Sequence, residues 1–208
     1  MNGTAHTALG AATGFVVANF YQTDPSTTAI LVGVGSIAGL IPDMDIDGKL
    51  SNKITFSHEI VRSVAQSIGF LMILYSFFEG IGQQKWLGIG VGIGIIVISS
   101  FIKQRHMLTI TGAGVLAGGI SLQESWLLLL GIYIILASFV AHRSYTHSVV
   151  GLLFFGFIAY QCQESLGITG LFATCLAGYV SHIVADMKVL PFNKRGVKLL
   201  LPFSKMEI

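Results

Sequence analysis

The sequence is divided into long apolar runs that only a few polar residues separate from one another. Eight such runs can be drawn, at about residues 7–21, 27–41, 64–78, 86–102, 107–120, 126–141, 149–161 and 167–185. The chain has too few polar residues to cover these runs, because only 11% of its residues are charged, whereas a soluble domain carries about 25%. The pattern therefore predicts an all-α fold, a polytopic integral membrane helix bundle with about eight transmembrane segments.

The length of the chain limits what else it can contain. Its 208 residues accommodate these segments and short loops, so residues 1–208 are predicted to form a single membrane domain. Within it, residues 64–141 are interpreted as a four-helix insertion, and the polar residues 46–62 as a loop with room for an interfacial helix. The glycines that recur in the insertion favour close helix contacts over a phosphate-binding loop, because no strand precedes them.

The basic residues and the cysteines argue against two kinds of site. The 12 lysines and arginines are not massed in one block and the net charge is only +2, so no nucleic-acid partner is expected. Cys162 and Cys175 lie in apolar runs without CxxC spacing, which argues against a disulfide framework or a thiolate metal site. The function is therefore sought among the other polar residues at the ends of the apolar runs.

The densest group of reactive side chains is the heptapeptide His142-Arg143-Ser144-Tyr145-Thr146-His147-Ser148. On an unbroken helix, His142 and His147 would lie about 140° apart and could not share a face. The chain is therefore predicted to break here, with Thr146 or Ser148 capping the next helix. After such a break the two imidazoles can converge on one site. The alternative is that both histidines only hydrogen-bond neighbouring helices at the membrane interface.

Three further polar positions occur at the ends of apolar runs. His6 precedes the first run, and Pro42-Asp43-Met44-Asp45 ends the second. His182 and Asp186 end the last run, and their spacing of four residues places them about 40° apart on one helix face. Such a pair can ligate a metal, or it can stabilise a helix end through a hydrogen bond.

Counting spans predicts that all these positions face the same side of the membrane. If every run crosses the bilayer once, His6, Asp43, the heptapeptide and Asp186 lie on one side. That side would also hold Lys49, Lys53, Arg62, Lys103, Arg105, Arg143, Lys188, Lys194, Arg195, Lys198 and Lys205, whereas the opposite side would hold only Lys85. Lysine and arginine are enriched on the cytoplasmic side, so the polar positions and both termini are predicted to be cytoplasmic.

Ionisable groups gathered near hydrocarbon are costly unless they pair with one another or bind a cation. The predicted metal centre comprises His6, Asp43, Asp45, His142, His147, His182 and Asp186, with ligands expected chiefly from Asp43, His147, His182 and Asp186. Mixed imidazole and carboxylate ligands suit Zn²⁺, Mn²⁺ or Fe²⁺. The number of candidates allows two metal ions, or one ion with orienting partners and a catalytic base.

Asp45 and His142 from this set, together with Arg143, are assigned catalytic roles. Asp45 is predicted to act as a general base on a metal-bound water, and Arg143 and His142 to steady the developing oxyanion. Arg143 can also be a simple topological anchor at the cytoplasmic interface. Outside the cluster, His106 is predicted to be a solvated loop residue, and His58 is a minor candidate for the site.

The motifs also resemble those of a known family. Thr4-Ala5-His6, Pro42-Asp43-Met44-Asp45, the heptapeptide and residues 178–186 occur in the order seen in YdjM-like, LexA-regulated, membrane-bound metal-dependent hydrolases. The similarity covers residues 1–48 and about 140–204, and residues 64–141 are additional to shorter members. The resemblance implies a bacterial inner (cytoplasmic) membrane protein with a metal-dependent hydrolase site.

The leading functional hypothesis is a metal-dependent hydrolase at the cytoplasmic membrane face. Its substrate is expected to be lipid-like or phosphorylated, with a phosphoester or other headgroup bond as the target. The segment 193–205 is predicted to lie along the inner leaflet and contact membrane lipids, because its basic residues surround an apolar patch at 199–203; they are Lys194, Arg195, Lys198 and Lys205. The alternatives are a transporter or metal-ion permease, whose ionisable residues would lie near the bilayer midplane, and a noncatalytic protein with a structural metal.

The topology can be tested with single cysteines. In a background that lacks Cys162 and Cys175, a cysteine at Asn52 is expected to resist membrane-impermeant thiol reagents in intact cells, because that position is predicted to be cytoplasmic. A cysteine at Gln123 is expected to react. The reverse labelling pattern would contradict the predicted orientation.

Overall fold

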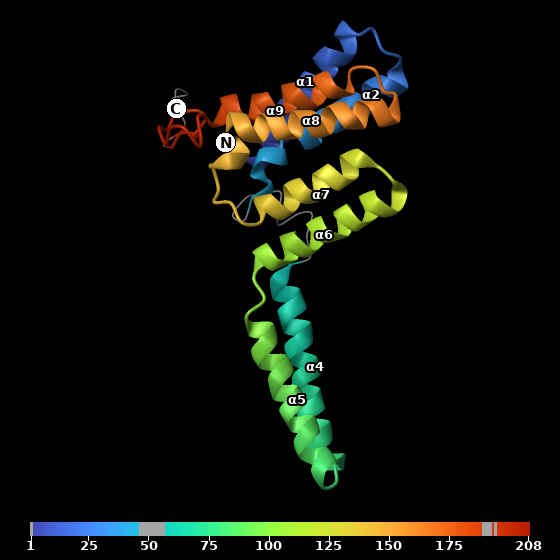
Figure 1. The fold of residues 1–208 in the computed structure, drawn as a ribbon, viewed down its shortest axis with the longest axis vertical. Helices are drawn as coiled ribbons and strands as arrows, with labels where there is room; N and C mark the ends of the chain where they lie inside the picture. Colours follow the sequence, from blue (N-terminus) through green and yellow to red (C-terminus); the bar gives the residue numbers. More distant parts are fainter. Residues whose placement is uncertain (1, 46–56, 189–192, 194) are drawn as a thin grey trace. The chain divides into compact units, whose positions relative to one another are not determined.

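The computed structural model describes residues 2–45, 57–188, 193 and 195–208, and the described chain is helical with short connections. Its α-helices are α1 (Gly3–Phe20), α2 (Pro25–Ala38), α4 (His58–Glu79), α5 (Gln83–Ser100), α6 (Gln104–Leu122), α7 (Ser125–Ala137), α8 (Val149–Leu166) and α9 (Leu171–Asp186), shown in Figure 1. Two short 3-10 helices, η1 (Ile41–Met44) and η2 (Tyr145–His147), lie in the connections. The described residues contain no strand, which confirms the all-α prediction.

The prediction of eight transmembrane segments is only partly supported. Among the described helices, α4 and α8 are each long and apolar enough to cross a membrane, and α5 with α6 adds a third span if the pair is counted as one. Helices α2, α7 and α9 are apolar but shorter. With 13 residues, α7 is about 20 Å long, less than the hydrocarbon core of about 30 Å. The apolar runs that form α2, α7 and α9 are therefore helical over less than the length of a span.

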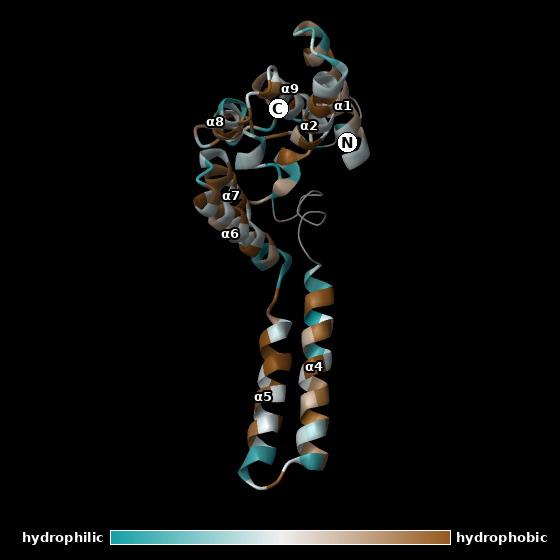
Figure 2. Cartoon of the chain, turned by 90° about the vertical axis from the view of Figure 1, so that its right-hand side faces the viewer, coloured by the Kyte–Doolittle hydropathy of each residue, from teal (hydrophilic) through white to brown (hydrophobic). Residues whose placement is uncertain are grey.

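The chain forms two compact units, residues 1–53 with 108–208, and residues 54–107. In the first unit, α9 packs against α1, α2 and α8, and α7 packs against α8. The second unit contains the hairpin of α4 and α5. Figure 2 shows apolar residues along much of both hairpin helices and hydrophilic residues where the hairpin turns. The proposed insertion at residues 64–141 thus contributes to both units, and the single domain of residues 1–208 stays a prediction.

Close backbone contacts hold α1, α2 and α9 together. A side chain on Gly10 of α1 would collide with the carbonyl group of Gly35 in α2, and one on Gly14 would collide with that of Leu31. A Cβ on Gly178 of α9 would lie 2.9 Å from the same carbonyl oxygen of Gly35. Small residues at these positions let three helices approach closely, as predicted for the first run. The contacts extend to the end of α2, where a Cβ on Gly39 would lie 2.6 Å from the carbonyl oxygen of His6.

Only some of the glycines of α5 and α6 lie at close helix contacts. A Cβ on Gly92 would lie 2.7 Å from the carbonyl oxygen of Gly69 in α4, and one on Gly119 would collide with the backbone of Leu128 in α7. In contrast, a Cβ would meet open space at Gly90, Gly94, Gly114 and Gly118. These four positions lie on the faces opposite to the helix contacts, where the packing interpretation does not hold.

Helix α4 begins earlier than the apolar pattern indicated. Residues 46–56 lie outside the described part of the chain, but residues 58–62, which were predicted as loop, form the first turn of α4. The guanidinium of Arg62 donates hydrogen bonds to the carbonyl oxygens of Ser100 (3.1 Å) and Ile102 (3.0 Å) at the end of α5. His58 Nδ1 lies 3.0 Å from Gln104 Oε1. These polar side chains find partners within the second unit, so the helix continues past the apolar run.

The prediction that His106 is a loop residue is wrong. His106 lies in the first turn of α6, and its Nδ1 accepts a hydrogen bond from the backbone N–H of Lys103 at 3.1 Å. This contact satisfies one of the backbone donors that a helix leaves free at its N-terminus. The histidine thus acts as a local cap.

The C-terminal segment is docked onto the first unit. Val197 and Ile208 exchange two backbone hydrogen bonds of 3.0 and 3.1 Å, and the N–H of Val149 donates to the carbonyl oxygen of Leu199 at 2.9 Å. Val197 and Leu201 are buried, whereas the side chain of Phe203 is 94% exposed. Part of the apolar patch in this segment packs into the protein. Only the rest of the patch is therefore available to contact lipids, as predicted for the segment.

The glycine contact can be tested by a pair of alanine variants in α2. Gly35→Ala places a methyl group against the carbonyl of Gly10 and is expected to destabilise the fold by about 1–3 kcal/mol through overpacking. Gly33→Ala is the matched control, because a Cβ there meets no atom within 4 Å. The measurement is the apparent Tm of the purified protein. Equal apparent Tm values for the two variants would contradict the close packing.

Candidate metal centre

Four segments that are distant in the sequence meet where α1 begins and α9 ends (Figure 1). His6 lies in the second turn of α1, Asp43 and Asp45 lie in and after η1, and His182 and Asp186 lie in the last turns of α9. The remaining residues lie in the connection between α7 and α8. All seven side chains of the predicted centre are therefore brought together.

The connection between α7 and α8 has the break that the spacing of its histidines predicted. Helix α7 ends at Ala137, and α8 begins at Val149 with Ser148 as its N-cap. Ser148 Oγ accepts a hydrogen bond from the backbone N–H of Gly151 at 3.4 Å, which confirms one of the two predicted caps. The break brings the rings of His142 and His147 to 5.3 Å between centroids.

The centre of the cluster consists of Asp43, His147, His182 and Asp186. All four are buried, and each offers a nitrogen or oxygen atom that lies within 4.8 Å of the others. His147 Nε2 lies 3.2 Å from His182 Nε2, and Asp43 Oδ1 lies 3.7 and 3.5 Å from these two nitrogens. Asp186 Oδ2 lies 3.8 Å from His182 Nε2. These are the four residues that the sequence named as chief ligands.

Hydrogen bonds behind the cluster fix the orientation of its two central imidazoles. His182 Nδ1 lies 2.7 Å from the carbonyl oxygen of Gly39, which can only accept a hydrogen bond, so Nδ1 carries the proton. In the neutral ring, His182 Nε2 then directs a lone pair into the cluster. His147 Nδ1 is held in the same way, 3.1 Å from Thr146 Oγ1. Metal-binding histidines use such contacts of the second nitrogen.

His6 joins the cluster from the opposite side of His182. The two rings are stacked with centroids 3.8 Å apart, and His6 Nε2 lies 3.3 Å from Asp186 Oδ1. Both ring nitrogens of His6 are buried, and neither makes a hydrogen bond of good geometry within the described residues. A buried imidazole without such a hydrogen bond is unfavourable, and a cation bound in the cluster would supply the missing partner.

A second group of donors consists of Asp45, His142 and His147. His142 Nδ1 lies 2.9 and 3.1 Å from the two carboxylate oxygens of Asp45, and Thr146 Oγ1 donates to Asp45 Oδ2 at 3.1 Å. Asp45 is fully buried, whereas the side chain of His142 is 32% exposed. His147 belongs to both groups because its two nitrogens face different carboxylates.

The pKa values of the two residues in the connections reflect this pairing. The hydrogen bond to Asp45 raises the pKa of His142 above its ordinary value, although burial acts in the opposite direction. Burial by itself raises the pKa of Asp43, but the neighbouring His147, His182 and His142 together lower it below its ordinary value. The Asp43 carboxylate is therefore ionised and available as a ligand.

Arg143 lies at the edge of the cluster and contacts two parts of the chain. Its Nη2 lies 3.3 Å from Asp186 Oδ2, and its Nη1 donates to the carbonyl oxygen of Arg195 at 2.9 Å. The backbone of Arg143 has a φ of 59°, a conformation that residues other than glycine seldom adopt. The surrounding contacts hold this arginine in place, which a simple topological anchor would not need.

Two residues of this site were not assigned a role there by the sequence. Thr146 was considered only as a helix cap, but its hydroxyl contacts both Asp45 and His147. Tyr179 is fully buried and donates a hydrogen bond to the carbonyl oxygen of Thr146. Tyr179 precedes His182 by three residues and so lies on the same face of α9, which was a usable signal.

The donor set fits a divalent metal ion. It combines buried imidazoles with lone pairs that point inward and buried carboxylates, and the second nitrogens of the central imidazoles are already hydrogen-bonded. A buried cluster of Asp and His residues that could hold a metal ion is therefore present. The identity and the number of ions stay predictions.

Comparison with known proteins gives one match. No curated protein and no solved structure matches the chain. The model of the family described as YdjM inner membrane protein matches residues 1–208, which is the whole of the chain. This match agrees with the order of the motifs and with the apolar helices of the structure. The chain therefore belongs to the YdjM inner membrane protein family.

Proposed function

We propose that this protein is a metal-dependent hydrolase that acts at the cytoplasmic face of the inner membrane. The observation that carries the proposal is the approach of His147 Nε2 and His182 Nε2 to 3.2 Å, with Asp43 Oδ1 within 3.7 Å of both. Three potential ligand atoms converge on one buried point, and a cation placed there satisfies all of them. The substrate is a lipid-like molecule with a phosphoester or other headgroup bond.

The balance of charge supports a bound cation. Asp43, Asp45 and Asp186 are each at most 2% exposed, and burying carboxylates is costly unless cations or strong hydrogen bonds offset their charge. The contacts described above supply one guanidinium, that of Arg143, and one imidazole with a raised pKa, that of His142. A divalent ion among the buried imidazoles would offset the remaining charge and keep those rings neutral.

The donor types favour Zn²⁺, Mn²⁺ or Fe²⁺. Because His147 belongs to both groups of donors, the cluster has room for two ions as well as for one with orienting partners. Asp43, His147, His182 and Asp186 would hold the first ion. A second ion at Asp45 and His142 would take the place of the His142 proton as the counter-charge of Asp45. When bound, such an ion polarises a phosphoryl oxygen and lowers the pKa of a coordinated water to about 7.

The remaining side chains have roles that follow from their positions. Asp45 accepts the proton of the attacking water, because its carboxylate is buried and fixed by His142 and Thr146. His142 is partly exposed at the edge of the cluster, and Arg143 lies beside it, so both can face an incoming substrate. Their charges would stabilise the oxyanion that develops on the phosphoryl group. His6 positions Asp186 through its contact with the carboxylate.

The location of the cluster distinguishes this proposal from transport. Ionisable residues of transporters lie near the bilayer midplane between broken helices. Here they lie in the first turns of α1, the last turns of α9 and the connections that carry η1 and η2. This arrangement suits a substrate whose polar bond lies at headgroup depth. The asymmetry of lysine and arginine in the sequence supports the cytoplasmic side.

Metal binding can be tested by removing single ligands. Wild-type protein purified gently is expected to carry stoichiometric divalent metal, and His147→Ala or Asp186→Ala is expected to weaken metal affinity by roughly tenfold or more while the protein stays membrane-inserted. His106→Ala is the matched control, because this histidine lies outside the cluster and contacts Lys103 and Arg105 at the start of α6. Elemental analysis per mole of protein gives the measurement. If the wild-type protein contains no metal and no added ion gives it activity, the proposed hydrolase function is contradicted.

Turnover can be separated from metal binding through Asp45. Asp45→Asn keeps the size of the side chain but removes the proton acceptor, so the rate of lipid-phosphate hydrolysis is expected to fall by roughly 10²-fold or more. Much of the bound metal is expected to remain. The control is Asp24→Asn. Asp24 is an exposed residue whose carboxylate caps α2, and its variant is expected to keep full activity. An Asp45→Asn variant with wild-type turnover would remove Asp45 from the mechanism.

A further inference from the structure

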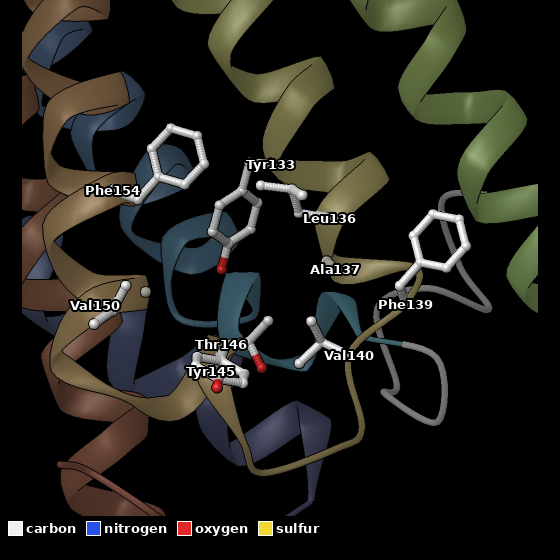
Figure 3. Close-up of a pocket in the computed structure, with 10 residues that line it drawn as sticks. Tyr133, Leu136, Ala137, Phe139, Val140, Tyr145, Thr146, Val150 and Phe154 are labelled. Atoms are coloured by element: carbon white, nitrogen blue, oxygen red, sulfur yellow. The ribbon is translucent and has the colours of Figure 1, made fainter. Parts of the chain in front are cut away.

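The first unit contains an apolar cavity that the hydrolytic chemistry does not use. Its volume is about 320 Å³, within the range of small-molecule sites, and it lies between α7, the connection that follows it and the start of α8 (Figure 3). Its lining consists of Tyr133, Leu136, Ala137, Phe139, Val140, Tyr145, Thr146, Val150, Gly151 and Phe154. Because nearly all of these side chains are apolar, the cavity suits hydrocarbon better than ordered water.

One wall of this cavity is shared with the cluster of Asp and His residues. Thr146 lines the cavity, and its hydroxyl donates to Asp45 Oδ2 at 3.1 Å. Tyr133 also lines the cavity, and its hydroxyl lies 3.1 Å from that of Tyr179, which in turn donates to the carbonyl oxygen of Thr146. Figure 3 shows the Tyr133 hydroxyl directed toward the Thr146 end of the cavity. A ligand in the cavity would therefore end beside the proposed general base.

The other walls of the cavity are open to the surroundings of the protein. Leu136 is 53% exposed, Phe139 66% and Val150 44%, although all three are large apolar residues. In an inner membrane protein such side chains face lipid, and α8 is one of the helices long enough to cross the bilayer. The cavity is thus open to the surroundings of the protein on one side, and Thr146 separates it from the cluster on the other.

We propose that this cavity binds a hydrocarbon chain of the substrate, which is a bilayer amphiphile with its phosphoester at the cluster. The assignment of the polar end rests on the proposed hydrolase function. The chain would enter between Leu136 and Val150 and run toward Thr146, with the headgroup at the partly exposed edge of the cluster formed by His142 and Arg143. The occupant is thus a lipid chain that is continuous with the reacting group.

The cavity acts by positioning rather than by attraction. A chain that leaves the bilayer for this cavity exchanges one apolar environment for another, so little free energy is gained from the hydrophobic effect. A chain held along the wall at Thr146 fixes where the attached phosphoester lies, and misplacement by about 1 Å can cost about 10²-fold in rate. Blocking the cavity should therefore affect amphiphilic substrates and spare a phosphoester that has no chain.

Two tryptophan variants on opposite walls test the occupant. Val150→Trp and Leu136→Trp fill the cavity from α8 and α7, and both positions are exposed, so the fold is expected to survive. Val149→Trp is the matched control, because Val149 is 39% exposed on the same helix but does not line the cavity. Each variant is placed in lipid nanodiscs with dodecyl phosphate that carries a diazirine in its chain, and labelled residues are mapped by mass spectrometry.

The expected labelling falls on cavity residues such as Val140 and Phe154. It should decrease by roughly tenfold in both cavity variants and stay unchanged in Val149→Trp, since an occupied cavity excludes the chain. Labelling spread evenly over the exposed residues of α7 and α8 would overturn the proposal. A cavity variant with a changed oligomeric state and unchanged labelling would overturn it as well, and would assign the surface to a second copy of the chain.

An activity measurement separates this proposal from that of the hydrolase. The two cavity variants are expected to lower kcat/KM for dodecyl phosphate by roughly tenfold or more, while hydrolysis of p-nitrophenyl phosphate stays at the wild-type level. Equal losses on both substrates would contradict a chain-binding role. If the wild-type protein hydrolyses neither substrate but the cavity is labelled as expected, the hydrolase proposal fails and the chain site stands.

Discussion

Direct contact between helix backbones is the constraint on which the rest of this structure depends. Gly10, Gly35 and Gly178 let α1, α2 and α9 approach until their main chains touch. That approach places the start of α1 and the end of α2 beside the last turns of α9. As a result His6 stacks on His182, and the carbonyl oxygen of Gly39 accepts a hydrogen bond from His182 Nδ1–H. In a membrane, where apolar side chains gain little by leaving lipid, such close packing is a main source of helix association. The polar cluster is therefore built on a framework of small residues.

The burial of the polar cluster within this framework costs free energy. Seven ionisable side chains lie together, and Asp45, His147 and His182 are fully buried, which is unfavourable unless each charge is offset. Other side chains of the protein offset part of this cost, because Thr146 and His142 hydrogen-bond Asp45, and Arg143 contacts Asp186. Inward lone pairs on His147 and His182, and the buried Nδ1 of His6, which has no hydrogen-bond partner, remain within the described chain. A divalent ion would satisfy these groups, which links the stability of this end of the protein to metal binding.

The connection between α7 and α8 joins the polar and apolar parts of the site. Its break presents His142, Arg143 and His147 to the cluster, while Val140 and Tyr145 from the same connection line the apolar cavity. Thr146 faces both, because its hydroxyl contacts Asp45 and the residue lines the cavity. The proposed cleavage of an amphiphile would use such a junction of apolar surface and polar side chains. The docked C-terminal segment reaches this region as well, through the contact of Arg143 with the carbonyl of Arg195.

The sequence by itself determined the helical class, the membrane family and the membership of the polar cluster. These follow from local patterns: low charge density excludes a soluble fold, and the spacing of His142 and His147 requires a break that Ser148 then caps. Only the tertiary structure decided where helices end and which atoms meet. The helical turn at His58 contacts Gln104 in another helix, which an apolar pattern does not contain. The lengths of α7 and α9 and the cap that His106 forms with the N–H of Lys103 were not visible in that pattern either. The spacing of Tyr179 and His182 indicates a shared helix face, but the contacts of Thr146 with Asp45 and of Tyr179 with Thr146 join segments more than thirty residues apart, which only the fold brings close.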